Sequence, residues 1–283
     1  MGVFRRRLGD IGLSSYGIIA VRCGTAAVFF ALFMLAKNPC EFKIRIKDFW
    51  LFIGSGIFSL LFFTACYFQA MTLMSLSAAA VLLYTAPIFV IIISAVLFKE
   101  KITKTKIVAM ILAFAGCCLV SGIAGGKADV TAAGILYGVG SGVGYALYSI
   151  FSKLAIQRGY TSNTINFYSC ALAFLGAGII WGFKEPVDLM IQSGTNLLFC
   201  LLTGFVTCFL PYALYVFGLT GVEAGRASIM VSVEPVVATA AGLIFFGETP
   251  DFFAVAGMVL VLAAIILLNV QTKPKKERNF NGR

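Results

Sequence analysis

Long runs of apolar residues, separated by short polar connectors, dominate the chain. Most of the runs contain roughly 18 to 25 residues, the length that a helix needs to cross about 30 Å of hydrocarbon. No stretch outside them is long enough to bury a soluble core, which excludes a catalytic domain outside the membrane. We predict nine helical runs, at 13–36, 49–70, 73–98, 105–123, 132–155, 162–183, 196–219, 222–246 and 252–270.

The composition is that of a membrane protein, because 60% of the 283 residues are hydrophobic and 12% are charged, whereas about 25% are charged in soluble domains. The net charge is +10, but the chain lacks the water-exposed face that a basic patch for nucleic acid needs. If the C-terminus is cytoplasmic and the runs alternate, most basic residues fall in cytoplasmic segments. We therefore expect a multi-pass protein of the cell membrane whose residues 271–283 form a basic cytoplasmic tail.

The two halves of the chain are related by a shift of 148 residues, and earlier in the chain by a shift of 147, which matches Cys23 with Cys170. The second half carries one additional run, 132–155. We therefore expect two five-helix units, 1–123 and 132–270, the first of which lacks its first helix. An odd number of helices per unit inverts one unit relative to the other, as is typical of transporters. The pairs matched by the shift of 148 are Tyr67 and Tyr215, Thr72 and Thr220, Ala79 and Ala227, Pro87 and Pro235, and Glu100 and Glu248.

The missing helix has a structural consequence that can be checked. If the chain folds without it, we expect an open groove beside Tyr145 and Tyr148, where that helix would pack.

Three short motifs follow one another along the chain. They are Gly12-Leu13-Ser14-Ser15 followed by Arg22, the helix exit Leu97-Phe98-Lys99-Glu100, and Val233-Glu234-Pro235-Val236 leading to Phe246-Gly247-Glu248. In their order and spacing they resemble the EamA-like branch of the drug/metabolite transporter superfamily, over essentially the whole chain. The resemblance implies a carrier of ten helices, formed by two inverted repeats around a central cavity, that works by alternating access. It also implies small substrates such as amino acids, other metabolites or drug-like compounds.

Two charged residues lie inside apolar runs, where a charge costs about 3 kcal/mol or more unless it is neutralised, paired or hydrated. Glu234 lies near the middle of 222–246, beside Pro235, which can break the helix and free carbonyl groups. We expect Glu234 to bind substrate or carry a proton, and a buried ion pair is the alternative. Arg22 must also pair, face water or bind an anion, and Glu234 is one candidate partner.

A polar stripe follows the run 132–155, in which Tyr137, Ser141, Tyr145, Tyr148 and Ser152 share one helical face. Glycines at intervals of four form an adjacent stripe that lets a neighbouring helix approach closely. We expect Ser141, Tyr145 and Tyr148 to line a substrate cavity. The alternative is that these hydroxyl groups bond to their own helix or to a neighbour.

Aromatic residues beside helix breaks are further candidates for the substrate site. Tyr84 precedes the break expected at Pro87, and a third break is expected at Pro211. Outside the site, we expect Glu100 to cap a helix or loop, and Glu223 and Arg226 to form a local ion pair.

The sequence argues against an enzyme. The absence of histidine excludes serine–histidine hydrolases and zinc sites of the His-Glu-x-x-His type. The glycine-rich run at 138–144 fails the spacing of a nucleotide-binding loop, and the cysteines form no Cys-x-x-Cys pair. We expect no cofactor and no metal, and a small-molecule transporter in the lipid bilayer, whose oligomeric state stays open. A non-transporting membrane scaffold or accessory subunit is the alternative.

Overall fold

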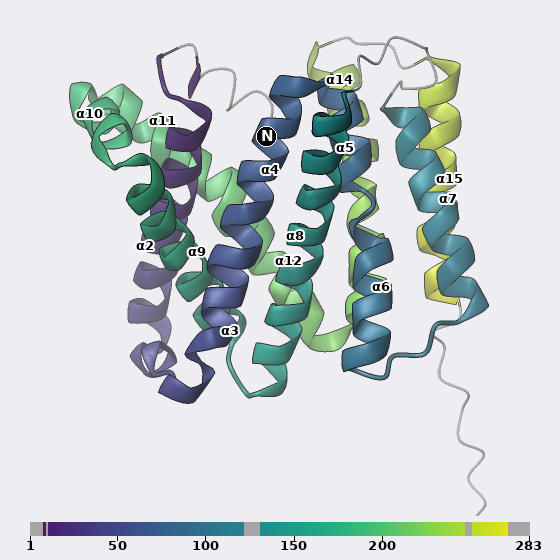
Figure 1. Cartoon of the computed structure of the whole chain (residues 1–283), viewed down its shortest axis with the longest axis horizontal. Coiled ribbons are helices and arrows are strands. Elements are labelled where there is room, and N and C mark those ends of the chain that lie inside the picture. The colour runs from purple at the N-terminus through teal and green to yellow at the C-terminus, as the bar shows by residue number, and fades with distance from the viewer. Residues whose placement is uncertain (1–7, 10, 122–130, 247–250, 271–283) are drawn as a thin grey trace, which may run out of the picture. The chain divides into compact units, whose positions relative to one another are not determined.

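The computed structural model describes residues 8–9, 11–121, 131–246 and 251–270, and every regular element within these ranges is a helix. The chain divides into two compact units, residues 1–100 with 128–228, and residues 101–127 with 229–283. Each unit therefore takes segments from both halves of the sequence (Figure 1).

The first unit is a bundle in which α2 packs along α9, and α8 packs against α4, α5 and α6. Two of its elements, η3 and η5, are π-helical turns that continue directly into α4 and α12. The short helices η1 (Pro39–Phe42) and η2 (Ile46–Asp48) connect α2 to α3. The other elements are α2 (Ser15–Lys37), α3 (Phe49–Ile53), η3 (Gly54–Leu61), α4 (Phe62–Leu73), α5 (Leu76–Leu83), α6 (Ala86–Leu97), α8 (Ala132–Gln157), α9 (Ser162–Trp181), α10 (Lys184–Gln192), α11 (Gly194–Gly204), η5 (Phe205–Phe209), α12 (Leu210–Gly221) and the start of α13 (Ala224–Met230).

The second unit contains α7 (Lys104–Val120), the end of α13, η6 (Val231–Val233), α14 (Glu234–Phe246) and α15 (Phe252–Val270). Helices α7 and α15 pack closely because glycines meet at their contact. A Cβ atom on Gly116 would lie 2.7 Å from the carbonyl oxygen of Gly257. Small residues at such a crossing allow two backbones to approach, as is common in membrane helices.

Hydroxyl side chains start most of the long helices. The Ser14 side chain accepts a hydrogen bond from the Gly17 N–H at the start of α2, with a donor–acceptor distance of 3.0 Å. Such a cap satisfies a backbone donor that the helix itself leaves unpaired. The other Ser and Thr N-caps are Ser75 before α5, Thr103 before α7, Thr131 before α8, Thr161 before α9 and Ser193 before α11.

The described residues place helices over all the predicted runs, and six helical segments are long and apolar enough to cross a membrane. Helix α7, the segment from α13 to α14, and α15 cover the other three runs. The sequence missed α10, which is short and buries only Pro186 and Leu189. The six segments are Ser15–Lys37, Ile46–Leu73, Leu76–Leu97, Ala132–Gln157, Ser162–Trp181 and Gly194–Gly221.

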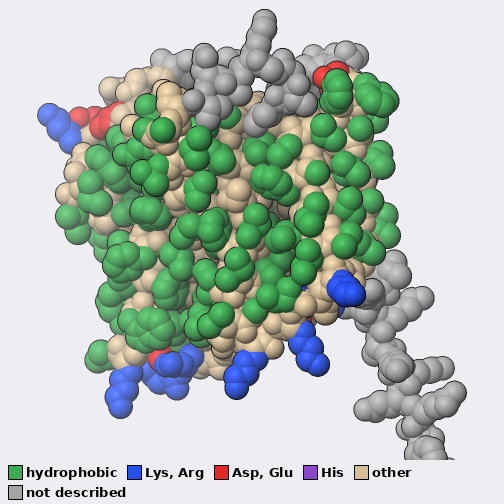
Figure 2. Space-filling view, turned by 45° about the vertical axis from the view of Figure 1, so that its right-hand side comes forward, with side chains coloured by type: hydrophobic (Ala, Val, Ile, Leu, Met, Phe, Trp, Pro, Cys, Tyr) green, Lys and Arg blue, Asp and Glu red, His purple; other side chains and the backbone are tan. Residues whose placement is uncertain are grey.

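Helices α2, α6 and α8 of the first unit finish at the same end (Figure 1), and basic residues gather there. Figure 2 shows Lys and Arg side chains along the lower edge of the view, beneath a largely apolar surface. Lys184 lies at the start of α10, beyond the opposite end of α9. The basic residues of this unit at or directly after the ends of these three helices are Lys37, Lys43, Arg45, Lys47, Lys99, Lys153 and Arg158.

Candidate functional site

Tyr145 and Tyr148 of α8 belong to a cluster of aromatic rings inside the first unit. The Tyr148 ring meets the Tyr212 ring edge to face, with centroids 4.9 Å apart, and stacks on Tyr215 at 6.5 Å. Tyr145 lies 6.2 Å from Tyr215 and 5.6 Å from Phe63. The structure therefore brings two of the predicted site residues together with two tyrosines of α12.

The hydroxyl groups of this cluster are hydrogen-bonded across helices. Tyr148 donates to Asn166 Oδ1 of α9 at 2.5 Å, and Asn166 Nδ2 donates to the Tyr212 carbonyl at 3.2 Å. The Tyr215 hydroxyl lies 2.7 Å from Ser149 Oγ. Buried polar groups are costly unless they are paired, so this tyrosine network ties α8, α9 and α12 together.

Arg22 of α2 lies at the edge of the same network and is only 7% exposed. Its Nε donates to Thr207 Oγ1 at 3.0 Å, and its Nη2 donates to the Thr207 carbonyl at 2.9 Å. That carbonyl is available because Pro211, four residues later, has no N–H to donate to it. Thr207 in η5 and Tyr212 in α12 lie on one continuous helical segment, which connects Arg22 to the tyrosine network.

Three buried cysteines lie close to this arginine. Cys170 Sγ lies 3.9 Å from Cys208 Sγ, and Cys23 interacts with Cys208 as well. All three are free thiols in the structure. Within the described residues no group of histidine, cysteine or acidic side chains is placed to hold a metal ion. The cysteines pack between α2, α9 and η5.

The rest of the polar stripe on α8 has several different environments. Ser141 is fully buried and donates to the Gly138 carbonyl of its own helix at 2.6 Å, which is the alternative that the sequence left open. Tyr137 is 39% exposed, and Ser152 is buried with no hydrogen-bond partner in the described part of the chain. The cavity-lining role of Ser141 stays a prediction.

The glycine stripe beside it packs as expected. A Cβ atom on Gly138 would lie 2.8 Å from Leu82 Cβ, and one on Gly142 would lie 2.6 Å from Thr85 Oγ1. Gly144 packs equally closely against Phe63 of α4. The glycines therefore let α4 and α5 approach α8.

The groove expected beside Tyr148 is contradicted by the structure. Tyr148 is 2% exposed, because the rings of Tyr212 and Tyr215 cover it. Tyr145 is half-buried.

Helix interruptions lie at the three predicted prolines. Pro87 is in the first turn of α6, after a break at Tyr84 and Thr85. Pro211 is in the first turn of α12, directly after the π-helical turn η5. Pro235 is the second residue of α14, after the 3-10 turn η6.

Glu234 and Tyr84 lie at two of these interruptions. Glu234 starts α14 in the second unit, and its side chain is exposed. Tyr84 ends α5 in the first unit and is half-buried. The hydrogen bonds of Arg22 described above lie within the first unit, so its pairing with Glu234 stays a prediction.

Comparison with known sequences identifies the family of this helical bundle. The sequence model described as "EamA-like transporter family" matches residues 1–122 and 132–270. The chain belongs to the EamA-like transporter family. It is therefore a multi-pass membrane transporter, and the resemblance inferred from the motifs is confirmed.

Relatives agree with this assignment, and a solved structure has a similar fold. An uncharacterized transporter of Archaeoglobus fulgidus is 29% identical over 257 residues, which cover 90% of this chain and 89% of the relative. The uncharacterized transporter YxxF of Bacillus subtilis is 25% identical over 278 residues, covering 95% and 86%. A crystal structure of a protein with 16% identity superimposes with a TM-score of 0.78 over 92% of this chain and 88% of the other, which supports the fold.

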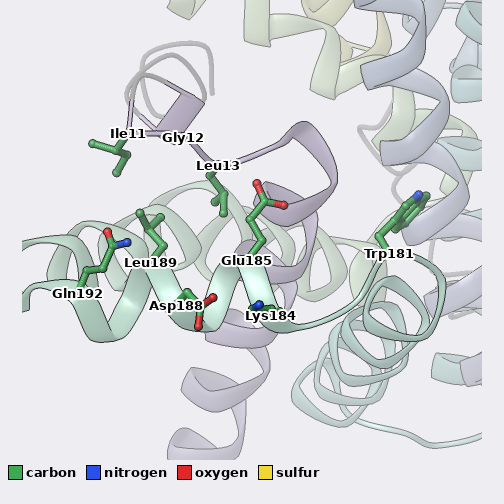
Figure 3. A pocket seen from close by; sticks show the side chains of 9 residues that line it. All are labelled: Ile11, Gly12, Leu13, Trp181, Lys184, Glu185, Asp188, Leu189 and Gln192. Atoms are coloured by element: carbon green, nitrogen blue, oxygen red, sulfur yellow. The ribbon is translucent and has the colours of Figure 1, made fainter.

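This EamA-like transporter has a cavity of about 420 Å³ beside the N-terminal end of α2, which the sequence did not predict. Glu185 of α10 lies on its wall and points to the start of α2 (Figure 3). Its carboxylate accepts hydrogen bonds from the Ser14 N–H and, at 2.6 Å, from Ser14 Oγ. A negative charge at a helix N-terminus is favourable. The lining residues are Ile11, Gly12, Leu13, Trp181, Lys184, Glu185, Asp188, Leu189 and Gln192.

A second unpredicted cluster lies at the basic end of the first unit. The Asp48 side chain is only 2% exposed and pairs with both Arg45 and Arg158. The Tyr160 hydroxyl donates to Asp48 Oδ2 at 2.8 Å. These contacts fasten the connection between α2 and α3 to the connection between α8 and α9.

Helix capping by Glu100 is confirmed. Its carboxylate accepts from the Ala224 N–H at 3.0 Å and from the Gly225 N–H at 3.4 Å, at the start of α13. The predicted ion pair between Glu223 and Arg226 is also present, at 3.2 Å. Glu248 lies outside the described residues.

Proposed function

We propose that this protein is a secondary transporter that moves a small metabolite, such as an amino acid or a drug-like compound, by alternating access. The proposal rests on family membership and on the arrangement of the two sequence repeats. Helix α2 packs along α9, and α7 packs along α15. The shifts of 147 and 148 residues make each of these pairs repeat-related. Equivalent helices that pack on one another favour two repeats related by a pseudo-two-fold axis, as in inverted-repeat carriers.

The buried tyrosine network is the observation that carries the proposed mechanism. It joins α8 and α12 to α9 through Tyr148, Asn166 and Tyr212, with Arg22 and Thr207 at its edge. Polar groups of this kind within membrane-spanning segments are expensive, and they usually mark a substrate or ion pathway. We assign Tyr145, Tyr148 and Arg22 to this pathway, together with the helix break at Pro211.

The orientation follows from the charges. Basic residues cluster where α2, α6 and α8 end, and cytoplasmic loops carry an excess of Lys and Arg. We assign this end to the cytoplasm of the cell membrane. The same assignment places the C-terminus in the cytoplasm, because the runs alternate in direction.

Reconstitution into vesicles tests the proposal. We expect saturable uptake of at least one radiolabelled compound from a panel of amino acids, nucleosides and cationic dyes. Tyr148→Phe, which removes a buried hydroxyl, should lower that uptake strongly. Tyr137→Phe is the matched control, because Tyr137 lies on the same helix and is 39% exposed. A folded wild-type protein that moves none of the panel in either direction would favour the scaffold alternative.

Glu234 provides a separate test of proton coupling. We expect Glu234→Gln to reduce transport without preventing membrane insertion, and to flatten the pH dependence of any remaining uptake. Glu223→Gln is the control, since Glu223 pairs locally with Arg226. Uptake by the Glu234 variant with the wild-type rate and pH profile would remove Glu234 from the mechanism.

A further inference from the structure

The two π-helical turns of the first unit occupy repeat-related positions. Element η3 spans 8 residues from Gly54 to Leu61, and η5 spans 5 residues from Phe205 to Phe209. The shift of 148 residues places 57–61 directly on 205–209. The same sequence pattern, a hydroxyl residue followed by glycine and, three residues later, by a second hydroxyl residue, occurs at both positions. It is Ser55-Gly56-x-x-Ser59 within η3, and Thr203-Gly204-x-x-Thr207 at the start of η5. Helical turns of this type are rare and are frequent at functional sites.

Each π-helical segment crosses a helix of the other repeat, and the two crossings are reciprocal. Gly56 of η3 meets α9, where an added Cβ would lie 2.8 Å from both Leu172 Cβ and the Ser169 carbonyl oxygen. Gly204, next to η5, meets α2, where an added Cβ would lie 2.7 Å from Thr25 Cβ. Since α2 and α9 are themselves repeat-related, both crossings use equivalent surfaces.

A side chain of the crossing helix forms a hydrogen bond with each π-helical segment, and we call this side chain the brace of that segment. Ser169 of α9 lies 2.6 Å from Ser55 Oγ. Arg22 of α2 holds both the hydroxyl and the carbonyl of Thr207. The shift of 147 residues places Arg22 on Ser169, so the two bracing side chains stand at equivalent positions. They contact different positions of the repeated pattern, because Ser55 is its first hydroxyl residue and Thr207 is its second.

The two crossings differ in the length of the π-helical segment and in the strength of the brace. The longer segment, η3, is braced by a hydroxyl, and the shorter one, η5, is braced by a guanidinium that donates twice. Hydrogen bonds from a charged donor are the stronger kind. In a carrier with inverted repeats, the inward-open and outward-open states exchange the conformations of the two repeats, so equivalent segments must differ within any one state.

We propose that η3 and η5 are paired hinges, and that Arg22 and Ser169 are positioning residues that set the balance between the two access states. This inference rests on the proposed alternating-access function. In the opposite state, η5 takes the longer π-helical form and η3 the shorter one. Weakening the two braces therefore shifts the balance in opposite directions.

Spin labels on the first unit measure that balance. One pair, at Ile11 and Leu76, reports the outer end, and a second pair, at Leu35 and Leu97, reports the inner end. All four side chains are exposed. Pulsed electron–electron double resonance on the reconstituted full chain, with its native cysteines replaced, measures the distance distribution between the two labels of each pair. The distribution gives the populations of the two states.

We expect Arg22→Gln to change the ratio of the two states about fivefold, the effect of losing one net hydrogen bond. Ser169→Ala should change it in the opposite direction, and Arg22→Lys, which keeps one charged donor, should have a smaller effect than Arg22→Gln. Thr207→Val removes the hydroxyl acceptor of Arg22 and leaves the carbonyl acceptor, and Ser55→Ala removes the hydroxyl partner of Ser169. These two variants provide a second opposed pair if an Arg22 variant folds poorly.

Shifts in the same direction, or unchanged populations in folded variants, would overturn the hinge proposal. If Arg22 and Ser169 have a purely structural role, all variants should have a lower thermal stability, and the populations of the two access states should not shift in opposite directions. The outcome is separable from the transport assay, because opposed shifts in a protein without measurable flux would support the hinges while contradicting the proposed function.

Discussion

Replacing Gly204 by alanine is a direct test of the close contact between α2 and the segment that leads into η5. The new Cβ would overlap Thr25 Oγ1 and lie 2.7 Å from Thr25 Cβ and 3.3 Å from the Ala26 nitrogen. Thr25 cannot turn away without loss, because its hydroxyl is buried and donates to the Val21 carbonyl at 2.6 Å. Overpacking of this kind costs about 1–3 kcal/mol. At about 2–4 °C per kcal/mol, the Tm should fall by roughly 2–12 °C.

Thermal unfolding of the purified protein in detergent, followed by a thiol-reactive fluorophore, measures this change. Gly218→Ala is the matched control in the following helix, since no atom lies within 4 Å of its added Cβ. An alanine at an open helical position is neutral or stabilising by up to about 1 kcal/mol. Thr25→Ala in the Gly204→Ala background should restore part of the loss. A Gly204→Ala protein as stable as the wild type would refute the tight crossing.

Three further variants test individual contacts. Tyr148→Phe leaves Asn166 Oδ1 without its donor and should destabilise the protein by about 1–3 kcal/mol, measured as a lower Tm; an unchanged Tm would mean that the hydrogen bond contributes nothing. Glu100→Ala removes the cap of α13 and should cost about 1 kcal/mol, so that amide exchange at the start of α13 becomes faster; equal exchange rates would contradict this. Glu185→Ala should increase proteolysis or labelling near Ser14 at the N-terminal end of α2, whereas Glu185→Gln should retain part of the protection; identical labelling of all three proteins would show that the hydrogen bonds between Glu185 and Ser14 do not hold this helix end in place.

The apolar pattern predicted helix positions well because a membrane-spanning helix requires about 20 consecutive apolar residues, which the sequence shows directly. The run predicted at 13–36 became α2 at Ser15–Lys37. The interruption at Pro87 was predictable from one residue, since proline cannot donate a backbone hydrogen bond. The short helix α10 was missed because only one face is apolar and it is too short to span a bilayer.

The partners of the site residues depend on contacts between distant parts of the chain. Arg22 bonds to Thr207, 185 residues away, and Glu185 bonds to Ser14 across 171 residues. Nothing in the periodicity of one helix selects such a partner. The repeated pattern of a hydroxyl residue, a glycine and a second hydroxyl residue, at Ser55 and at Thr203, was the available signal for the two π-helical segments.

Counterflow in vesicles is the most direct test of the central claim that this EamA-like protein carries a small molecule by alternating access. Vesicles containing the reconstituted wild-type chain are loaded with unlabelled substrate, and the entry of the same labelled compound is followed. The account predicts that unlabelled substrate inside accelerates labelled entry and drives a transient accumulation above the outside concentration, with loss of both effects in Tyr148→Phe. Labelled entry that is linear in concentration and independent of the substrate inside would contradict it.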